Sequence, residues 1–292
     1  AGVDCNCDSF SADDMLVVCE RLRAEGVAGF LPTIITDEIE VMSARLARLA
    51  EVRSANPLIE EMILGIHIEG PFISAAPGYV GAHPAKAVRP ANLADMQRLL
   101  DAAEGLTRIV TLAPELDEGL HATRFLADQG ITVAAGHCDP SLDKLREAID
   151  AGLRMFTHLG NGCHHQIPRH DNIIERTLSC ADKLWISFIA DGAHVPFFAL
   201  NNYLRAAGIE NCVVVSDAIS AAGLGPGRYK VAGQEAIVGE DRVPRSTEGS
   251  HFVGSATSLP QMAENLSCHL HFSEEDVQQL TSVGPRTILG MD

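Results

Sequence analysis

Seven short apolar runs recur along the chain, and they limit most strongly which folds it can adopt. They follow one another at intervals of about 20 to 35 residues, and each has the length of a buried strand. The segments between them carry apolar residues at helical spacing. Buried strands that alternate with amphipathic helices indicate a parallel sheet covered by helices, which is the α/β class. The runs are Ala28–Ile35, Ile63–Ile68, Arg108–Leu112, Ile131–Ala135, Arg154–Thr157, Ile186–Ala190 and Val213–Val215.

The pattern leaves two arrangements of such a sheet open, an open doubly wound sheet and a closed barrel. A closed barrel of this kind has eight strand–helix units, whereas seven are found here. Residues 1–10 read as a loop that leads into a helix opened by Ser11, so a missing first strand is expected upstream of Ala1. A later helix is expected to start at Pro140 and to stop at Gly152.

Composition bounds the size and the class of the protein. The chain has 292 residues, 46% of them hydrophobic, which suits one large barrel. No linker rich in Pro, Gly or Ser divides it, so a single domain over residues 1–292 is expected. The net charge of −17 and the lack of a Lys/Arg cluster exclude a nucleic-acid binder. No apolar stretch approaches 20 residues, so no membrane span is expected.

The cysteine pattern indicates a reducing compartment. Eight cysteines are scattered through the chain without disulfide-like or CxxC spacing. We therefore expect reduced, mostly buried thiols and place the protein in the cytoplasm.

Polar side chains follow six of the seven runs at the point where each run ends. The carboxyl ends of parallel strands point to one face, and barrel enzymes keep their chemistry there. Scattered polar residues would not choose this position repeatedly, so the pattern predicts an active site on that face. The side chains are Glu69, Glu115, His137, His158, Asp191 with His194, and Asp217.

Glu69, His137 and His158 supply one carboxylate and two imidazoles, a set that suits a catalytic zinc or iron ion with an open position. A metal-bound water has a pKa near ~7, so hydroxide is available as a nucleophile. Asp217 could take its proton and pass it to a leaving group. The alternatives are hydrogen-bonded core histidines and an Asp217 that caps the next segment. His67 is expected to be structural, either alternating away from Glu69 or stacking inside the wall.

Several motifs, taken in order, resemble a known family. They are "FLPTIIT", "GIHIEGPFI" with "GAHP", "VTLAPE", "GHCDP", "FTHLGNG", "IADGAHV", "VVVSDAISAAG" and "FVGSATSLPQMAENL". Together they resemble the signature segments of the N-acetylglucosamine-6-phosphate deacetylases of the amidohydrolase superfamily, over about residues 2 to 290. The resemblance implies a (β/α)8 TIM-type barrel of the metal-dependent hydrolase kind. It also implies hydrolysis of the acetamide of N-acetylglucosamine 6-phosphate to glucosamine 6-phosphate and acetate.

The resemblance also implies roles for individual residues. Glu69, His137 and His158 match the family's metal ligands, with zinc as the expected divalent ion and iron as the alternative. Asp217 matches the general base and acid, and His83 matches a residue that helps to polarise the substrate carbonyl. In this scheme the metal-bound hydroxide attacks while Asp217 accepts its proton and then protonates the departing amine.

A second group of positions matches the family's substrate-binding residues. Asn161 and Gly162 match the loop that binds the sugar phosphate, and Val253–Gly254 matches a backbone stretch that closes over the sugar. Arg169 matches an arginine that a neighbouring subunit presents to the phosphate, so a homodimer is expected. The full group is Asn161, Gly162, Arg169, His194, Val253 and Gly254.

Three departures from the family pattern leave the identity of the substrate less determined than the type of reaction. The family's first strand, with its His-x-His or Gln-x-Asn segment, and its small β-sandwich are both expected to be missing. "GCHHQIPRHDN" also differs from the usual loop, and we expect His164 and His165 to be exposed there. Two alternatives to the deacetylase therefore stay open: another amide or cyclic-amide hydrolase of the superfamily, and a non-catalytic sugar-phosphate-binding barrel.

Overall fold

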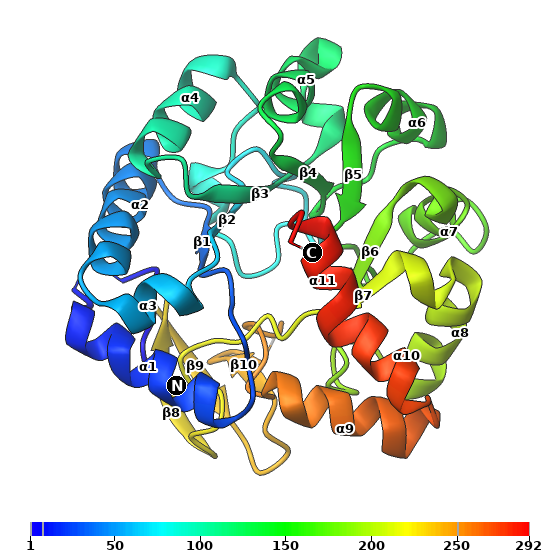
Figure 1. Cartoon of the computed structure of the whole chain (residues 1–292). Coiled ribbons are helices and arrows are strands. Elements are labelled where there is room, and N and C mark those ends of the chain that lie inside the picture. Colours follow the sequence, from blue (N-terminus) through cyan, green and yellow to red (C-terminus); the bar gives the residue numbers. More distant parts are fainter. Residues whose placement is uncertain (1, 8, 250, 292) are drawn as a thin grey trace.

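A curled sheet of seven parallel strands forms the centre of the molecule (Figure 1). The computed structural model describes residues 2–7, 9–249 and 251–291. The strands are neighbours in the order of the chain, from β1 to β7. Every apolar run therefore forms a strand as expected, and the α/β class is confirmed. The strands are β1 (Thr33–Ile35), β2 (Ile66–Glu69), β3 (Thr107–Leu112), β4 (Thr132–Ala135), β5 (Leu153–Phe156), β6 (Trp185–Phe188) and β7 (Cys212–Val214).

β1 is shorter than its apolar run, Ala28–Ile35. Phe30 forms only an isolated bridge with Ile63, and Pro32 lies between that bridge and the strand. Because proline has no N–H with which to continue the ladder, the pairing is interrupted there.

Helices cover the outer face of the curled sheet (Figure 1). A π-helical turn, Gln279–Val283, joins the last two of them. The α-helices are α1 (Ala12–Ala24), α2 (Ile39–Ser54), α3 (Pro57–Met62), α4 (Leu93–Ala102), α5 (His121–Asp128), α6 (Leu142–Asp150), α7 (Ile173–Leu178), α8 (Phe197–Ala207), α9 (Leu259–Leu270), α10 (Glu274–Gln278) and α11 (Gly284–Ile288).

The helix starts follow local capping chemistry. Ser11 and Ser273 each open a helix through a capping box. The helix expected from Pro140 begins instead at Leu142, because the side chain of Ser141 caps it.

The interior of the curled sheet is filled from one end by the C-terminal helix. Ile288 and Leu289, at the end of α11, pack against the inward-facing side chains of the sheet, and Figure 1 shows α11 lying across the open centre. The polar side chains at the carboxyl ends of the strands are thereby left to line the rest of the interior. The inward-facing residues of this cluster are Ile109, Ala134, Met155 and Val213.

The outer edge of β1 is paired by a side chain. The Asn6 amide nitrogen donates to the carbonyl of Thr33 at 2.9 Å, and its amide oxygen accepts from the N–H of Ile35 at 2.9 Å. These are the bonds that a neighbouring strand would make, so Asn6 satisfies an edge that would otherwise be exposed.

A second, antiparallel sheet was not predicted from the sequence. It consists of β8 (Gly227–Val231), β9 (Gln234–Val238) and β10 (Pro244–Ser246). Its inner residues pack on Ala82 and Ile219, and the Gln234 side chain donates to the carbonyl of Ala82 at 2.7 Å. The sheet therefore holds the segment that leads to His83.

All eight cysteines are free thiols, as expected, but only four of them are buried. Within the described part of the chain, no helix combines the length and the apolar character needed to cross a membrane.

Candidate metal centre

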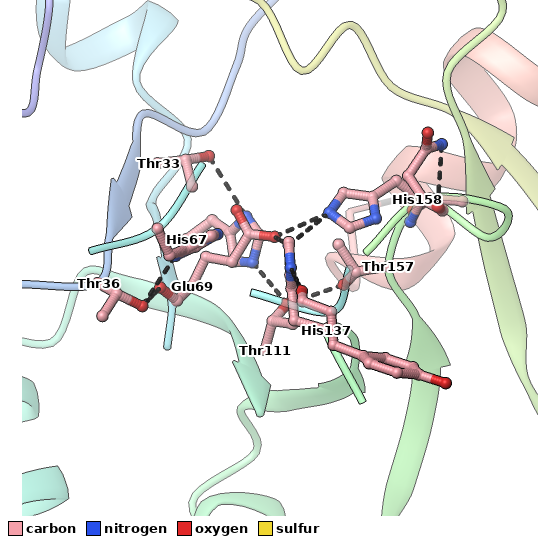
Figure 2. A network of polar contacts seen from close by, with 12 residues as sticks. Thr33, Thr36, His67, Glu69, Thr111, His137, Thr157 and His158 are labelled. Atoms are coloured by element: carbon pink, nitrogen blue, oxygen red, sulfur yellow. Dashed lines mark hydrogen bonds and ion pairs between the residues drawn. The ribbon is translucent and has the colours of Figure 1, made fainter. Parts of the chain in front are cut away.

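The three residues expected to bind a metal meet at the carboxyl ends of their strands (Figure 2). Glu69 ends β2, while His137 and His158 each follow their strands, β4 and β5, by two residues. The Nε2 atoms of the two histidines are 3.1 Å apart, and they lie 3.2 Å (His137) and 3.0 Å (His158) from Glu69 Oε1. Ligands held about 2.1 Å from one ion are separated by roughly 3 Å, so the cluster has the dimensions of a metal site.

The hydrogen bonding of His137 also suits a cation. Its Nδ1 lies 2.7 Å from the carbonyl oxygen of Tyr79, which can only accept, so the neutral ring carries its proton on Nδ1. The lone pair of Nε2 then points at Glu69 and His158. An oriented imidazole of this kind is typical of metal ligands. Zinc and iron both fit two imidazoles and one carboxylate.

The backbone is strained where these side chains leave their strands. His137, His158 and Asp217 have φ angles of 52°, 36° and 45°, in the left-handed region that residues other than glycine seldom adopt. Such conformations cluster at functional sites. Here they occur after β4, β5 and β7, at the residues to which the sequence assigns chemistry.

The charge states of the clustered side chains favour the binding of a cation. Burial raises the pKa of the Glu69 carboxyl, but the hydrogen bonds and positive charge of His137 and His158, in the forms that carry a proton on Nε2, outweigh burial and hold that pKa well below its usual value. Burial lowers the pKa of His83 to about 3, with the neighbouring His137 acting in the same direction. At neutral pH the centre therefore contains a buried carboxylate beside an uncharged His83, and a cation would neutralise this carboxylate.

Asp217 and His83 face the same cavity as the metal cluster. The cavity has a volume of about 1340 Å³ and continues through the interior of the curled sheet to Ile288 and Leu289. Burial lowers the pKa of His158, but the nearby Glu69 outweighs burial and raises that pKa above its usual value. The charge of Asp217 acts in the same direction as Glu69. The structure thus brings the expected base and the expected ligands together.

Most of the expected substrate-binding residues also line this cavity, whereas Arg169 does not. Arg169 is exposed, which leaves its side chain accessible to a second copy of the chain. His194 is held by Asp191, with 2.7 Å between His194 Nδ1 and Asp191 Oδ2. The cavity-lining members of the group are Asn161, Gly162, His194, Val253 and Gly254. His164 and His165 are exposed, as expected, and line the cavity as well.

Glu115 lies away from the cavity, and one of the two positions considered for His67 is excluded. Glu115 does not line the cavity, because its carboxylate accepts a hydrogen bond from the N–H of Asp139 at 2.6 Å on the outer surface. His67 does not alternate away from Glu69, since residues two apart on a strand share a face. Its ring takes the second of the two positions considered: it lies on the inner side of the sheet, where it lines the cavity, with Nε2 2.8 Å from the hydroxyl of Thr111.

Three contacts of the site were missed by sequence reasoning. The carbonyl of Tyr79 orients His137, and the hydroxyl of Ser187 accepts from the N–H of His158 at 2.7 Å. The hydroxyl of Thr36 lies 2.8 Å from Nδ1 of His83. Thr36 directly follows β1, so the strand-end rule could have found it.

A parallel α/β fold with a buried His/His/Glu cluster at the carboxyl ends of its strands is the architecture of metal-dependent hydrolases. No protein-family model matches the chain. It is 32% identical to the N-acetylglucosamine-6-phosphate deacetylase of Bacillus subtilis, over 99% of this chain and 72% of that protein. The chain therefore belongs to the N-acetylglucosamine-6-phosphate deacetylase family.

Other relatives and solved structures agree with this assignment. The N-acetylgalactosamine-6-phosphate deacetylase of Escherichia coli O157:H7 is 31% identical over 100% of this chain and 75% of its own length. The crystal structure of N-acetyl-D-glucosamine-6-phosphate deacetylase from Mycobacterium smegmatis has a TM-score of 0.88 at 28% identity, over 99% of this chain and 75% of that one. The enzyme from Thermotoga maritima gives 0.86 at 26% identity, over 99% and 75%.

Gly162 packs directly against a candidate ligand, and this contact yields a prediction. A Cβ atom at Gly162 would lie 2.9 Å from Nδ1 of His137, where the ring is already fixed by the carbonyl of Tyr79. Gly162→Ala is therefore expected to displace the ring and to weaken zinc binding about 10- to 100-fold. Competition with a chromogenic chelator measures this affinity.

Gly130→Ala is the matched control. Gly130 has a φ of 73°, and a Cβ atom added there would meet nothing within 4 Å. This variant should lose about 1 kcal/mol of unfolding free energy through backbone strain and should keep its zinc affinity. Equal zinc affinity in both variants would contradict the role given to the Gly162 contact.

Proposed function

We propose that the protein hydrolyses the acetamide of N-acetylglucosamine 6-phosphate to glucosamine 6-phosphate and acetate. The observation that carries this proposal is the meeting of Glu69, His137 and His158 around one point, in a cavity that Asp217 also lines. Membership of the deacetylase family supports the choice of substrate.

Glu69, His137 and His158 are proposed to hold one divalent ion, with zinc as the first choice and iron as the alternative. When bound, such an ion polarises a carbonyl group and makes a water molecule acidic. Glu69 supplies the negative charge of the set, and the hydrogen bond from His137 to Tyr79 keeps that imidazole aimed at the ion.

Asp217 is proposed as the general base and acid. Its carboxylate accepts a proton from the attacking water as the water oxygen bonds to the acetyl carbon. The same proton then goes to the nitrogen as the C–N bond breaks, so that the amine leaves neutral. The acetic acid formed loses its remaining proton to solvent and is released as acetate. His83 is proposed to donate a hydrogen bond to the acetyl oxygen, where negative charge develops.

The sugar phosphate is proposed to lie toward the loop after β5. Gly162 offers its backbone N–H to the phosphate and Asn161 its side-chain amide, and the φ of 58° at Gly162 allows the close approach. His194 and the Val253–Gly254 segment contact the sugar in this scheme. Arg169 acts from a second copy of the chain as a bidentate phosphate ligand, which makes the working form a homodimer.

We also propose that the seven strands are those of a (β/α)8 barrel, with residues 1–292 in one domain. The curled sequential order from β1 to β7 supports a barrel, and Asn6 lies on the edge of β1 where an eighth strand would pair. The second sheet, β8 to β10, is a single antiparallel layer in the described residues, and the β-sandwich of the family resemblance is not proposed for them. The eight free thiols support a location in the cytoplasm.

Measurement of acetate and free amine after incubation with N-acetylglucosamine 6-phosphate and zinc tests the proposal. We expect turnover with this compound and a much lower kcat/KM with unphosphorylated N-acetylglucosamine, since the phosphate contacts would be lost. Equal kcat/KM values would mean that the protein does not recognise the phosphate, and they would favour another amide hydrolase. Binding without turnover would favour the non-catalytic alternative.

The 6-phosphate of N-acetylgalactosamine is a second candidate substrate. The Escherichia coli relative is named for that epimer and is about as similar to this chain as the Bacillus relative. The ratio of kcat/KM for the two epimers decides between them.

A further inference from the structure

Tyr79 makes two contacts with the short turn that follows β4. Its carbonyl oxygen lies 2.7 Å from Nδ1 of His137, and its hydroxyl donates to Oδ2 of Asp139 at 2.9 Å. Because His137 and Asp139 are two residues apart, the main chain and the side chain of one residue bind the same turn. The proposed mechanism gives the hydroxyl no role.

Tyr79 lies in a loop, residues 74–83, whose middle has few other contacts. Residues 75–78 are exposed, and Gly78 and Gly81 have φ angles of 85° and 56°. The loop is held at its ends, where the N–H of Ser74 donates to the carbonyl of His137 and the carbonyl of Ala82 accepts from a side chain of the second sheet. Among the described residues, the Tyr79 hydroxyl is the only side-chain group of residues 75–81 that hydrogen-bonds outside the loop.

The side chain of Tyr79 is directed away from the cavity. Gly78 and residues 80–83 line the cavity, whereas Tyr79 does not. Burial raises the pKa of Tyr79, and the hydrogen bond with Asp139 acts in the same direction. The phenol therefore keeps its proton at neutral pH and donates it to a carboxylate, which can only accept. A hydrogen bond to an ionised acceptor is stronger than one between neutral groups.

Arg176, on α7, fixes the carboxylate that accepts this bond. Its Nη1 donates to Oδ1 of Asp139 at 2.9 Å and to the carbonyl of Pro140 at 3.0 Å, while its Nε donates to Oδ1 of Asp171 at 2.6 Å. The two oxygens of Asp139 are thus divided between Tyr79 and Arg176, and the carboxylate cannot turn without breaking one of these bonds. We call Tyr79, Asp139 and Arg176 the latch.

We infer that Tyr79 is a positioning residue whose hydroxyl, through the latch, keeps the Tyr79 carbonyl on Nδ1 of His137 and thereby keeps Nε2 of His137 aimed at the metal. The inference rests on the proposed metal centre and not on the identity of the substrate. The partners that orient a metal-binding imidazole affect metal affinity without touching the ion. A hydroxyl on the outer surface would in this way act on the centre of the cavity.

Tyr79→Phe tests the inference in the full-length protein, because it keeps the ring and removes only the hydroxyl. We expect zinc to bind about 10-fold more weakly, as measured by competition with a chromogenic chelator. In the zinc-free protein, the peptide that covers residues 74–83 should exchange its amide hydrogens about 10-fold faster, as measured by mass spectrometry.

Tyr229→Phe is the matched control. The Tyr229 hydroxyl also donates to a single acceptor, the carbonyl of Gly225 at 2.9 Å, and Tyr229 lies outside the cavity lining. This variant should keep its zinc affinity and its exchange rate in residues 74–83 within about twofold. If Tyr79→Phe and Tyr229→Phe agree in both quantities, the inference is overturned.

A double substitution asks whether the hydroxyl acts through the latch. Asp139→Ala removes the acceptor, so adding Tyr79→Phe to Asp139→Ala should change zinc affinity less than about twofold. A further 10-fold loss in the double variant would show that the hydroxyl acts without Asp139 and would overturn the inference.

These measurements separate the inference from the proposed function. If the protein binds zinc but hydrolyses none of the tested sugars, and its zinc affinity depends on the Tyr79 hydroxyl, the function is wrong and the positioning role stands. If turnover is normal and neither zinc affinity nor amide exchange depends on this hydroxyl, the function stands and the positioning role is wrong.

Discussion

Asp217→Asn is expected to lower kcat for the amide substrate by about 100- to 10,000-fold while zinc stays bound at the level of the unaltered protein. The carboxylate lines the cavity of the metal cluster but is not one of the three atoms that meet there. An asparagine amide cannot take a proton from water at neutral pH, so the proton transfer is lost while the site keeps its shape. Steady-state rates and metal analysis of the same samples measure the two quantities.

An exposed aspartate provides the control for this substitution. The side chain of Asp143 is 91% exposed on α6 and does not line the cavity, and Asp143→Asn should change neither rate nor zinc content. Near-normal turnover in Asp217→Asn would remove Asp217 from the mechanism. Loss of zinc in that variant would instead make Asp217 a ligand.

Glu69→Gln should abolish tight zinc binding and, with it, turnover. The substitution removes the negative charge of the set and leaves two neutral imidazoles and an amide, so we expect zinc affinity to fall more than about 100-fold. A bound ligand stabilises the folded state by about 2.7 kcal/mol at 100 times its Kd. Addition of a chelator should therefore lower the unfolding temperature of the unaltered protein and leave that of Glu69→Gln unchanged.

The exposed residue Glu118 offers the matched control. Glu118→Gln should retain both zinc and the response to the chelator. A Glu69→Gln protein that held one zinc per chain with unchanged affinity would contradict the assignment of the metal centre.

The parallel sheet could be predicted because its strands are buried on both faces. Runs such as Val213–Val215 are apolar without interruption, and every run overlaps the strand that it predicted. The second sheet has no such signal. β8 is largely exposed, and its polar residues outnumber its apolar ones. The strongest sequence signal for this sheet is the hairpin turn at Ala232–Gly233, where both φ angles are positive. Alanine seldom adopts such a conformation, so the sequence indicates this turn only weakly.

The parts of the site that could be predicted are those whose chemistry depends on the type of side chain at the end of a strand. Glu69, His137 and His158 satisfied that rule, and the structure brings them together. The carbonyl of Tyr79 could not be found in this way, because every residue has a carbonyl and only the folded loop shows which one faces His137. For His67 two positions were left open, and the strand period of two, which places it on the same face as Glu69, could have excluded the first of them.

The left-handed turns at His137, His158 and Asp217 bear on what this protein does with its cavity. Each such conformation costs of order 1 kcal/mol or more in unfolding free energy. Three such bends follow the carboxyl ends of strands, two of them at candidate metal ligands, so the fold gives up about 3 kcal/mol or more of stability where these side chains enter the cavity.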